Sequence, residues 1–435
     1  MNICCVGGGP AGLYFAIAAK RFDPGHRIRV VERRPAGTTY GWGIVFWDDL
    51  VRSLERTDRE SARSIRAGAI SWTGQRLCVE GGRPVHLGGT GYGMSRQRLV
   101  SLLAHRAVAL GVDVQFDREA DPARALKESD LVVLSDGAAS RLRRTWSDRF
   151  GTAESVTGNK HLWLGSTVPF TDFTFALERT AAGWIWFHGY RFDEQHSTVI
   201  VECTRETWQR LGFDAEEEEV CRATLTRIFA RHLDGHPLLG RRDGQGAARW
   251  DSFTTVTNMR WHSDGVVLVG DAAHTAHFSV GSGTTLAVKD AIGLARCLAG
   301  RPPSELPVAL QCYQESRLPE VEHVQAQAAR SAAWFADLDR LASLPPLDLG
   351  FSLRTRRDLD GPPPHVVNRA GIRYGLHLAT QWRAGRAMRR AASRTRTAVQ
   401  NLAADPEGRV KRIAGSLTGV RRAGSSLRSG TRGCS

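Results

Sequence analysis

The sequence predicts an α/β fold: a doubly wound, Rossmann-like parallel sheet that carries an inserted, mostly antiparallel sheet and ends in C-terminal helices. Two observations predict the doubly wound sheet. The chain begins with a short apolar run, a glycine-rich turn and apolar residues at helical spacing, NICCVGGGPAGLYFAIAAKRF (2–22). Far along the chain the same pattern returns, where GVVLV (265–269) leads into GDAAHTAHFSVGSGTTLAVKDA (270–291). Strand–turn–helix units of this kind build parallel sheets.

The composition narrows the class of protein. A hydrophobic content of 42% and 12 Trp exclude an intrinsically disordered chain. The eight Cys are scattered without a CxxC or CxxH pair, so we expect neither a metal site nor a disulfide framework. The apolar start lacks a basic flank and is broken by glycine and proline, and no run of about 18 apolar residues occurs, so we expect no signal peptide and no membrane span. We therefore expect a cytoplasmic protein.

The net charge of +14 is concentrated near the end of the chain, since residues 383–435 hold 13 Arg and Lys but only Asp405 and Glu407 as acids. We expect residues 401–435 to be disordered, because Ser, Gly and Arg dominate them. A basic tail is compatible with nucleic acid or a membrane surface, but a solvated extension is the simpler interpretation. We therefore expect no nucleic-acid partner, and the oligomeric state stays open.

The first glycine-rich turn has the Gly-x-Gly-x-x-Gly spacing of a dinucleotide-binding fingerprint. Its first glycine permits a tight turn, the second lets the backbone approach a pyrophosphate, and the third lets helix and strand pack closely. The helix N-terminus offers free N–H groups to the phosphates, and an acidic residue about 20 positions further on accepts hydrogen bonds from a ribose. The candidate residues for this end of the ligand are Gly7, Gly9, Pro10, Ala11, Gly12, Glu32 and Arg33.

The fingerprint alone does not distinguish NAD from FAD, but two later stretches favour FAD. LVVLSDGAASRLRR (131–144) is typical of a buried strand followed by an acidic turn, and GVVLV leads to a second acidic turn. FAD needs both glycine-rich turns, because its pyrophosphate binds at the first turn and its ribityl chain and flavin ring bind at the later one. Asp271 is expected to bind a ribityl hydroxyl, and a helix starting near Gly283 points its positive end at the flavin ring. The candidate residues here are Asp136, Asp271, Gly281, Gly283 and Thr284.

These three motifs, in this order, give the chain a resemblance to the single-component FAD-dependent aromatic hydroxylases of the p-hydroxybenzoate hydroxylase type, over residues 1 to about 300. Four stretches resemble more narrowly the salicylyl-CoA 5-hydroxylase and 2-aminobenzoyl-CoA monooxygenase group, and more distantly the violacein-pathway hydroxylases. They are TTYGWGIVFWDD (38–49), FTFALERTAAGWIWFHGYRFDEQHSTVIVECTRETW (173–208), GDAAHTAHFSVGSGT (270–284) and SAAWFADLDR (331–340). His277 and Phe278 replace the proline pair of most aromatic hydroxylases, as they do in the aryl-CoA group.

The resemblance implies an NADH- or NADPH-dependent FAD monooxygenase. In this family the nicotinamide binds transiently and reduces tightly bound FAD, O2 adds to the flavin, and the C4a-hydroperoxide hydroxylates an electron-rich ring. The resemblance also implies that Arg96 contacts the FAD phosphate or adenosine, and that Trp42 and Gly43 form a loop against the flavin, with Phe46 beside the substrate. GGTGYG (88–93) lacks an apolar strand before it, so we expect a loop and not a second nucleotide-binding turn.

The substrate end must be dry, because water destroys the reactive flavin intermediate. In GWIWFHGY (183–190), period-two alternation puts four side chains on one face of a strand: Trp184, Trp186, His188 and Tyr190. We expect this face to form a pocket wall, although ordinary core packing also explains it. His188 is expected to deprotonate a phenol or bind a carbonyl, with a structural histidine as the alternative. His277 is expected to position the substrate or transfer a proton, and Phe278 to lie near the reacting ring.

Within this resemblance the expected substrate is a small aromatic ring carried as a CoA or carrier-protein thioester. A free aromatic acid or an indole is the alternative. A halogenase fits less well, because His188 and Gly189 replace the Ile-Pro of its tryptophan motif. A non-catalytic flavin-binding partner protein is the most distant alternative.

The order of the motifs predicts the domain boundaries. An FAD-binding domain is expected to be discontinuous, over 1–75, 95–155 and 255–320. The substrate domain is expected over 76–94 and 156–254, C-terminal helices over 321–400, and the basic tail over 401–435.

Overall fold

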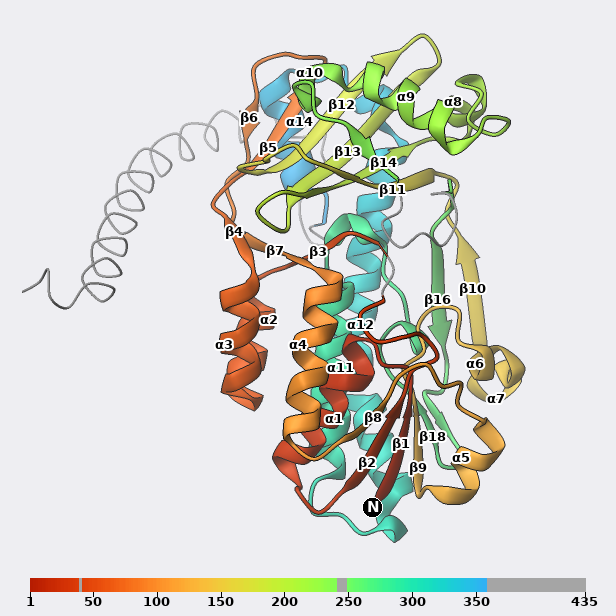
Figure 1. Cartoon of the computed structure of the whole chain (residues 1–435). Helices are drawn as coiled ribbons and strands as arrows, with labels where there is room; N and C mark the ends of the chain where they lie inside the picture. Colours follow the sequence, from red (N-terminus) through yellow and green to blue (C-terminus); the bar gives the residue numbers. More distant parts are fainter. Residues whose placement is uncertain (39–40, 241–248, 358–435) are drawn as a thin grey trace, which may run out of the picture. The chain divides into compact units, whose positions relative to one another are not determined.

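The computed structural model describes residues 1–38, 41–240 and 249–357. The predicted helices beyond residue 357 and the predicted disordered tail, 401–435, lie outside the described residues. Four sheets and their flanking helices make up the described part (Figure 1). No helix in this part is long and apolar enough to cross a membrane. No group of three metal-ligating side chains occurs in it either.

A six-stranded sheet has the order β17-β18-β9-β1-β2-β8, and all of its neighbours are parallel except β17 and β18. Strands β9 and β18 are apolar along their whole length, and β1 is apolar after Asn2, as expected of a parallel sheet that helices cover. This sheet confirms the predicted doubly wound class. Its strands are β1 (Asn2–Val6), β2 (Arg27–Val31), β8 (Asp113–Gln115), β9 (Leu131–Leu134), β17 (His262–Ser263) and β18 (Val266–Leu268).

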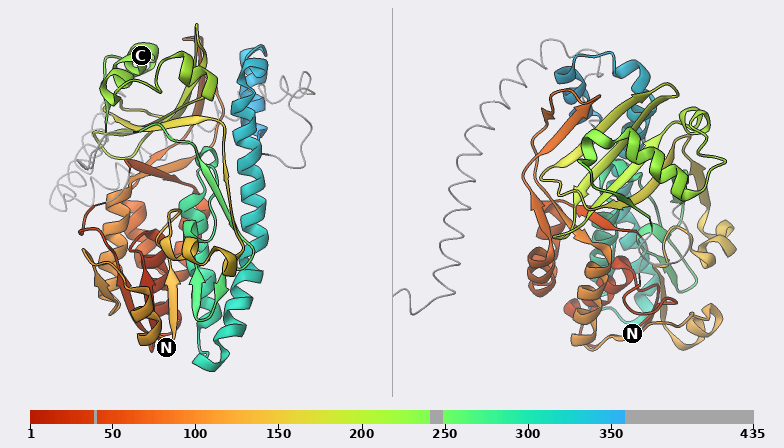
Figure 2. Two further views of the ribbon diagram at one scale, coloured as in Figure 1. Left: turned by 90° about the vertical axis from the view of Figure 1, so that its right-hand side faces the viewer. Right: turned by 45° about the horizontal axis from the view of Figure 1, so that its top comes forward.

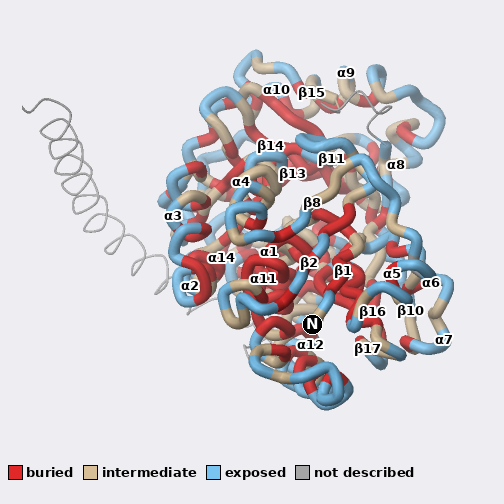
Figure 3. The backbone as a smooth tube through the Cα atoms, turned by 60° about the horizontal axis from the view of Figure 1, so that its bottom comes forward, coloured by how far each residue is buried: buried red, intermediate tan, exposed pale blue. Residues whose placement is uncertain are grey.

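Helix α1 (Pro10–Phe22) is the centre of the packing around this sheet, and every residue from 11 to 19 is buried. It packs against α4 (Arg96–Ala109) and α11 (Gly283–Leu298), and Figure 3 shows α1 and α11 among the buried segments. The remaining helices of this part are α2 (Asp48–Thr57), α3 (Arg59–Gly68), α5 (Pro122–Glu128), α6 (Arg141–Thr145) and α7 (Ser147–Phe150), with the short 3-10 turns η1 (Gly270–Ala272), η2 (Phe278–Val280) and η3 (Pro303–Glu305).

A seven-stranded sheet has the order β15-β11-β14-β13-β12-β5-β6 and is antiparallel except between β5 and β12. The predicted alternation in β13 is confirmed: Trp184 and Trp186 belong to one apolar cluster, while Ile185 and Phe187 belong to another on the opposite face. The strands are β5 (Gln75–Val79), β6 (Val85–His86), β11 (Lys160–Ser166), β12 (Phe173–Thr180), β13 (Gly183–Arg191), β14 (Ser197–Cys203) and β15 (Leu238–Leu239).

Different helices pack on the two faces of the seven-stranded sheet. The Phe187 face packs against α8 (Arg205–Arg210), α9 (Glu218–Ile228) and α10 (Ala230–Leu233). The Trp186 face packs against the end of α12 (Leu306–Ala336) and against α13 (Leu338–Leu341) and α14 (Pro346–Thr355). Because α12 contributes Tyr313 to the core of the six-stranded sheet and Phe335 to that of the seven-stranded sheet, it joins the two (Figure 2).

Two small sheets connect these parts: β10 (Thr152–Val156) with β16 (Thr254–Asn258), and β7 (Gly91–Ser95) between β3 (Gly43–Phe46) and β4 (Ile70–Trp72). The loop predicted over 88–93 is therefore wrong from Gly91 onward, and Gly43 begins a strand. The glycines of β7 serve close packing, because a Cβ on Gly93 would lie 2.1 Å from the carbonyl oxygen of Arg191.

Candidate functional site

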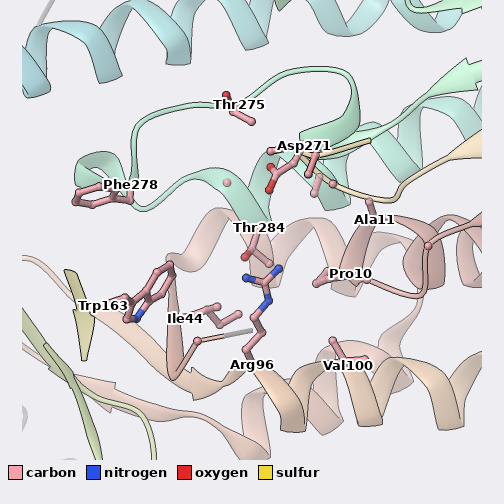
Figure 4. Close-up of a pocket in the computed structure, with 18 of the residues that line it drawn as sticks. Pro10, Ala11, Ile44, Arg96, Val100, Trp163, Asp271, Thr275, Phe278 and Thr284 are labelled. Atoms are coloured by element: carbon pink, nitrogen blue, oxygen red, sulfur yellow. The ribbon is translucent and has the colours of Figure 1, made fainter. Parts of the chain in front are cut away.

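A cavity of about 1790 Å³ lies where the carboxyl ends of β1, β2, β9 and β18 face the seven-stranded sheet. In Figure 4 it extends from Pro10 and Ala11, at the start of α1, to Trp163 and Phe278. The predicted site residues in its wall are Gly7, Gly9, Pro10, Ala11, Glu32, Arg33, Trp42, Arg96, Asp136, His188, Tyr190, Asp271, Phe278, Gly281, Gly283 and Thr284. A single cavity therefore brings together motifs from both ends of the sequence.

The first turn is built by glycines with distinct roles. Gly7 has φ +108°, and a Cβ there would lie 2.5 Å from the carbonyl oxygen of Ser135. Gly12 lies behind the cavity wall, and its Cβ would lie 2.2 Å from the carbonyl oxygen of Gly7. Gly9 differs, because a Cβ there would meet no atom of the described residues within 4 Å. The space beside Gly9 is thus open to a ligand, whereas Gly7 and Gly12 let strand and helix approach.

Two helix N-termini open onto this cavity. Helix α1 begins after Gly9 and α11 begins at Gly283, and both glycines are in the cavity wall. Within the described ranges, neither helix start receives a side-chain cap. Their first N–H groups and positive dipole ends are therefore available to an anionic or electron-rich ligand.

Glu32 follows β2 and lines the cavity. One carboxylate oxygen accepts a hydrogen bond from the Gly8 backbone N–H at 2.7 Å, and the other accepts from the Arg34 N–H at 3.0 Å. These bonds fix the carboxylate beside the first turn, and each oxygen retains a further acceptor site.

Asp271, Arg96 and Thr284 meet at the second turn, where Figure 4 shows Arg96 extending from the start of α4 toward Thr284. Asp271 is exposed and lines the cavity. Burial raises the pKa of its carboxyl, and the charge of Arg96 opposes this. Burial likewise lowers the pKa of Arg96, opposed by Asp271. The two side chains therefore stabilise each other's charged form.

Asp136, after β9, leaves a polar atom unsatisfied. Its Oδ1 is buried and has no hydrogen-bond partner among the residues that the structure describes. Burial raises the pKa of this carboxyl, which the hydroxyl of Ser140 partly offsets by hydrogen bonding. An unsatisfied buried acceptor in a cavity wall is where a ligand donor binds.

A buried ion network holds the Gly270-Asp271 turn in place. Asp290 of α11 accepts hydrogen bonds from His274 Nε2 at 2.7 Å, Arg317 Nε at 3.0 Å and the Gly270 N–H at 3.3 Å. His274 and Arg317 lower the pKa of Asp290 against its burial. The sequence analysis did not identify Asp290 or Arg317, because their spacing from the turn carries no motif.

The far end of the cavity is aromatic. Cross-strand pairing aligns Trp163, Ile200, His188 and Phe175 in one row, and Tyr190 with Thr198 in the next. Burial drives the pKa of His188 well below its usual value, so its imidazole is neutral. In the part of the chain with a described structure, its Nε2 and the indole N–H of Trp163 lack hydrogen-bond partners. The apolar wall therefore contains the neutral imidazole of His188, which can donate or accept a hydrogen bond, and the indole N–H of Trp163, which can donate one.

Several predicted residues lie outside the wall. Phe46 is in the core of the six-stranded sheet and stacks on Tyr92, with centroids 5.3 Å apart. Trp184 and Trp186 share the face of His188 but lie nearer the start of the strand. There Phe335 covers Trp186, with the two ring centroids 5.5 Å apart. The alternation in β13 identified the face that includes the cavity wall. It did not show that α12, α13 and α14 cover the part of this face at Trp184 and Trp186.

Two further predicted residues lie just behind the cavity. Gly43 is in β3, where its carbonyl accepts a hydrogen bond from the Tyr190 hydroxyl at 2.8 Å. His277 is buried beside Phe278, and its ring faces Phe253 and Glu202. Conversely, His161, Trp163, Phe173 and Phe175 line the cavity and were not predicted. The alternating F-T-F of β12 is a signal that could have identified the last two.

The chain matches one family model, described as "FAD binding domain", over residues 1–328. The salicyloyl-CoA 5-hydroxylase of a Streptomyces species is 37% identical over 78% of this chain and 66% of its own length. The 3-hydroxy-4-methyl-anthranilyl-[aryl-carrier protein] 5-monooxygenase of Streptosporangium sibiricum is 36% identical over 82% of this chain and 94% of its own.

The fold also matches solved structures. The tetrameric form of 2-methyl-3-hydroxypyridine-5-carboxylic acid oxygenase superposes with a TM-score of 0.59 and 21% identity. The match covers 82% of this chain and 97% of that one. At this identity the likeness concerns the fold alone.

Proposed function

Because the chain belongs to the FAD binding domain family and is an FAD-dependent aromatic monooxygenase, we propose that it hydroxylates an aromatic ring presented as an aryl thioester, with O2 and NADH or NADPH as co-substrates. The observation that carries the proposal is that one cavity joins two open helix N-termini to an aromatic wall with unsatisfied polar atoms. The end of the cavity at the helix N-termini suits the cofactor, and the aromatic end suits a flat aromatic ring.

The residues of the cavity fit FAD. The open space beside Gly9 accommodates a pyrophosphate at the start of α1. Glu32 suits a ribose, and the unsatisfied Oδ1 of Asp136 suits a ligand hydroxyl or N–H. Asp271 and Arg96 suit the ribityl and phosphate groups. When bound and reduced, FAD supplies the activation of O2 and the transfer of one oxygen atom to the ring.

The chain's own residues prepare the substrate. Phe173, Phe175, Trp163 and Phe278 surround the ring and exclude water. His188 is neutral and its lowered pKa makes it a weak base, so it can accept a hydrogen bond from a ring hydroxyl or amino group. The assignment of this role to His188 rests on its position in the wall and its unsatisfied Nε2.

The aryl-thioester assignment rests on two observations. The relatives at 37% and 36% identity act, by their names, on an aryl-CoA and on an aryl group held by a carrier protein. Arg249 and Arg357 place two cationic side chains in the cavity wall, and cations of this kind bind the phosphates of a CoA or phosphopantetheine arm. A free aromatic acid is the second candidate, because the aromatic side chains of the wall contact only the ring, and an arginine also binds a carboxylate.

We infer a cytoplasmic enzyme. NADH and NADPH are supplied there, and the described cysteines are all free, as a reducing compartment requires.

Rapid-mixing measurements of flavin reduction test the thioester assignment. The FAD-loaded enzyme is mixed anaerobically with NADH or NADPH and with salicyl-CoA, anthranilyl-CoA, their phosphopantetheine thioesters, free salicylate or tryptophan. We expect a thioester to accelerate reduction by at least about tenfold, with hydroxylated product after admission of air. Acceleration by free salicylate or tryptophan alone would contradict the assignment and favour the second candidate.

A further inference from the structure

A buried carboxylate lies directly behind the aromatic wall. Glu202 of β14 is 1% exposed and shares its face with Ile200, which lines the cavity. Its cross-strand neighbours are His161 and Trp186. Its Oε1 accepts a hydrogen bond from Asn159 Nδ2 at 2.9 Å, and its Oε2 accepts one from Trp186 Nε1 at 3.2 Å. Both donors are neutral, so among the described residues no hydrogen-bonded cation compensates a charge on this carboxylate.

His277 presents a third donor to the same group. The backbone N–H of Ser279 donates to His277 Nδ1 at 3.3 Å, and the Ser279 hydroxyl lies 2.9 Å from the same nitrogen. Because Nδ1 accepts, the proton of the neutral ring is on Nε2. That nitrogen lies 4.0 Å from Oε1 of Glu202. The N–H of His277 therefore faces the carboxylate across a short gap.

Glu202 and His277 lie next to residues that form the cavity wall. His277 is the residue before Phe278, and the two rings are 4.2 Å apart. From the other side, Arg356 donates to the carbonyl of Ser279 at 2.9 Å and stacks over Phe175 at 5.4 Å. The turn that carries Phe278 is therefore held by Arg356 through Ser279, and it faces Glu202 through His277.

We propose that Glu202 is a positioning residue, which in its ionised form holds His277 and so fixes Phe278 against the substrate ring. That Phe278 is fixed against a substrate ring rests on the proposed function. The contact between Glu202 and His277 is independent of that function. Glu202 does not line the cavity, so in this proposal it acts through His277.

The charge of Glu202 changes near neutral pH. Burial raises its pKa to about 7, against the hydrogen bonds from Asn159 and Trp186 and the charge of Arg356. The other titratable groups that face it from the packed elements do not change there. Burial lowers the pKa of His161 to about 4 and of His277 to about 3, and drives that of His188 well below its usual value. Burial also lowers the pKa of Arg356, but a guanidinium stays protonated near neutral pH, so Arg356 is the neighbouring cation. Above pH 7 the carboxylate therefore attracts the His277 N–H, and below pH 7 it attracts it less.

Nitrogen-15 NMR of the FAD-loaded, histidine-labelled enzyme tests the contact, with His277→Asn to assign the signal. We expect the Nε2 shift of His277 to titrate with a midpoint near 7 in the wild type and to lose this step in Glu202→Gln. The matched control is Glu178→Gln, on the opposite face of the sheet, where Glu178 bonds His232 Nε2 at 2.7 Å. The Glu178→Gln variant should keep the titration step of His277 Nε2 near pH 7. An unchanged titration in Glu202→Gln, or no step in the wild type, overturns the proposal.

Turnover tests the consequence. The fraction of oxidised NAD(P)H recovered as hydroxylated thioester should rise with pH through 7 in the wild type and in Glu178→Gln. In Glu202→Gln it should stay at the low-pH level of the wild type at all pH values, several-fold below the wild-type value above pH 7, with unchanged FAD content. A Glu202→Gln profile that coincides with the wild type overturns the positioning role. If the wild type hydroxylates no thioester, the proposed function fails, while the NMR titration still decides the role of Glu202.

Discussion

Gly9→Ala is expected to fold as the wild type does but to bind FAD at least about tenfold more weakly. Gly9 has φ −75°, which alanine adopts freely, and in the part of the chain that the structure describes its Cβ would meet no atom within 4 Å. The added methyl group therefore strains nothing in the protein and occupies only the space that a pyrophosphate needs at the start of α1. Flavin content after gel filtration and an FAD titration by fluorescence measure the loss, and thermal unfolding of the apoproteins measures the fold.

Gly12→Ala is the matched contrast, in the same turn. Its Cβ would lie 2.2 Å from the carbonyl oxygen of Gly7 and 2.4 Å from Ser135 Oγ, so β1, α1 and β9 must separate. We expect a loss of about 3 kcal/mol of unfolding free energy from this overpacking. If Gly9→Ala instead kept wild-type FAD affinity, the cofactor would not occupy the space beside this turn.

The second large effect is expected at Asp290. Asp290→Asn should lower the free energy of unfolding by about 3 kcal/mol at pH 7, because the buried side chains of Arg317 and His274 lose their carboxylate. The pKa of Asp290 is depressed in the folded state, so its contribution is complete above the unfolded carboxyl pKa of about 3.9 and fades as the pH falls toward the folded value. Urea unfolding at pH 7 and at decreasing pH measures both effects.

Asp264→Asn provides the control for Asp290. Asp264 pairs with Arg149 at 3.0 Å, but its side chain is 74% exposed, so its loss should cost less than about 1 kcal/mol. FAD affinity should fall in Asp290→Asn and not in Asp264→Asn, because only Asp290 holds the turn that carries Asp271. Equal stabilities of the two variants at pH 7 would show that the network does not support the turn.

The sequence predicted the parts of the fold and site that local pattern determines. The glycines of the first turn, the acidic residue after β2 and the Gly-Asp turn after β18 all have fixed spacing along the chain. Gly7, Gly9, Glu32 and Asp271 from these motifs line one cavity. The alternation in β13 identified the face that includes His188 and Tyr190, because the side-chain period of a strand is independent of what packs on it.

The remainder depends on contacts between distant segments. The sequence analysis expected Trp186 in the pocket, but Phe335, about 150 residues later, covers it. Phe46 was expected beside the substrate, but it stacks on Tyr92 of a strand that was predicted to be a loop. Glu202 and His277 become neighbours only when the turn before α11 meets β14. No periodicity within either segment carries that information.

The measurement that tests the central claim most directly is mass spectrometry of the product formed from salicyl-CoA under oxygen-18 gas, with FAD-loaded enzyme and NAD(P)H. If the cavity holds both the cofactor and an aryl thioester, the product is a hydroxylated thioester that carries one oxygen atom from O2 and none from water. Oxidation of NAD(P)H that yields only hydrogen peroxide, with salicyl-CoA and its anthranilyl and phosphopantetheine counterparts unchanged, would contradict it.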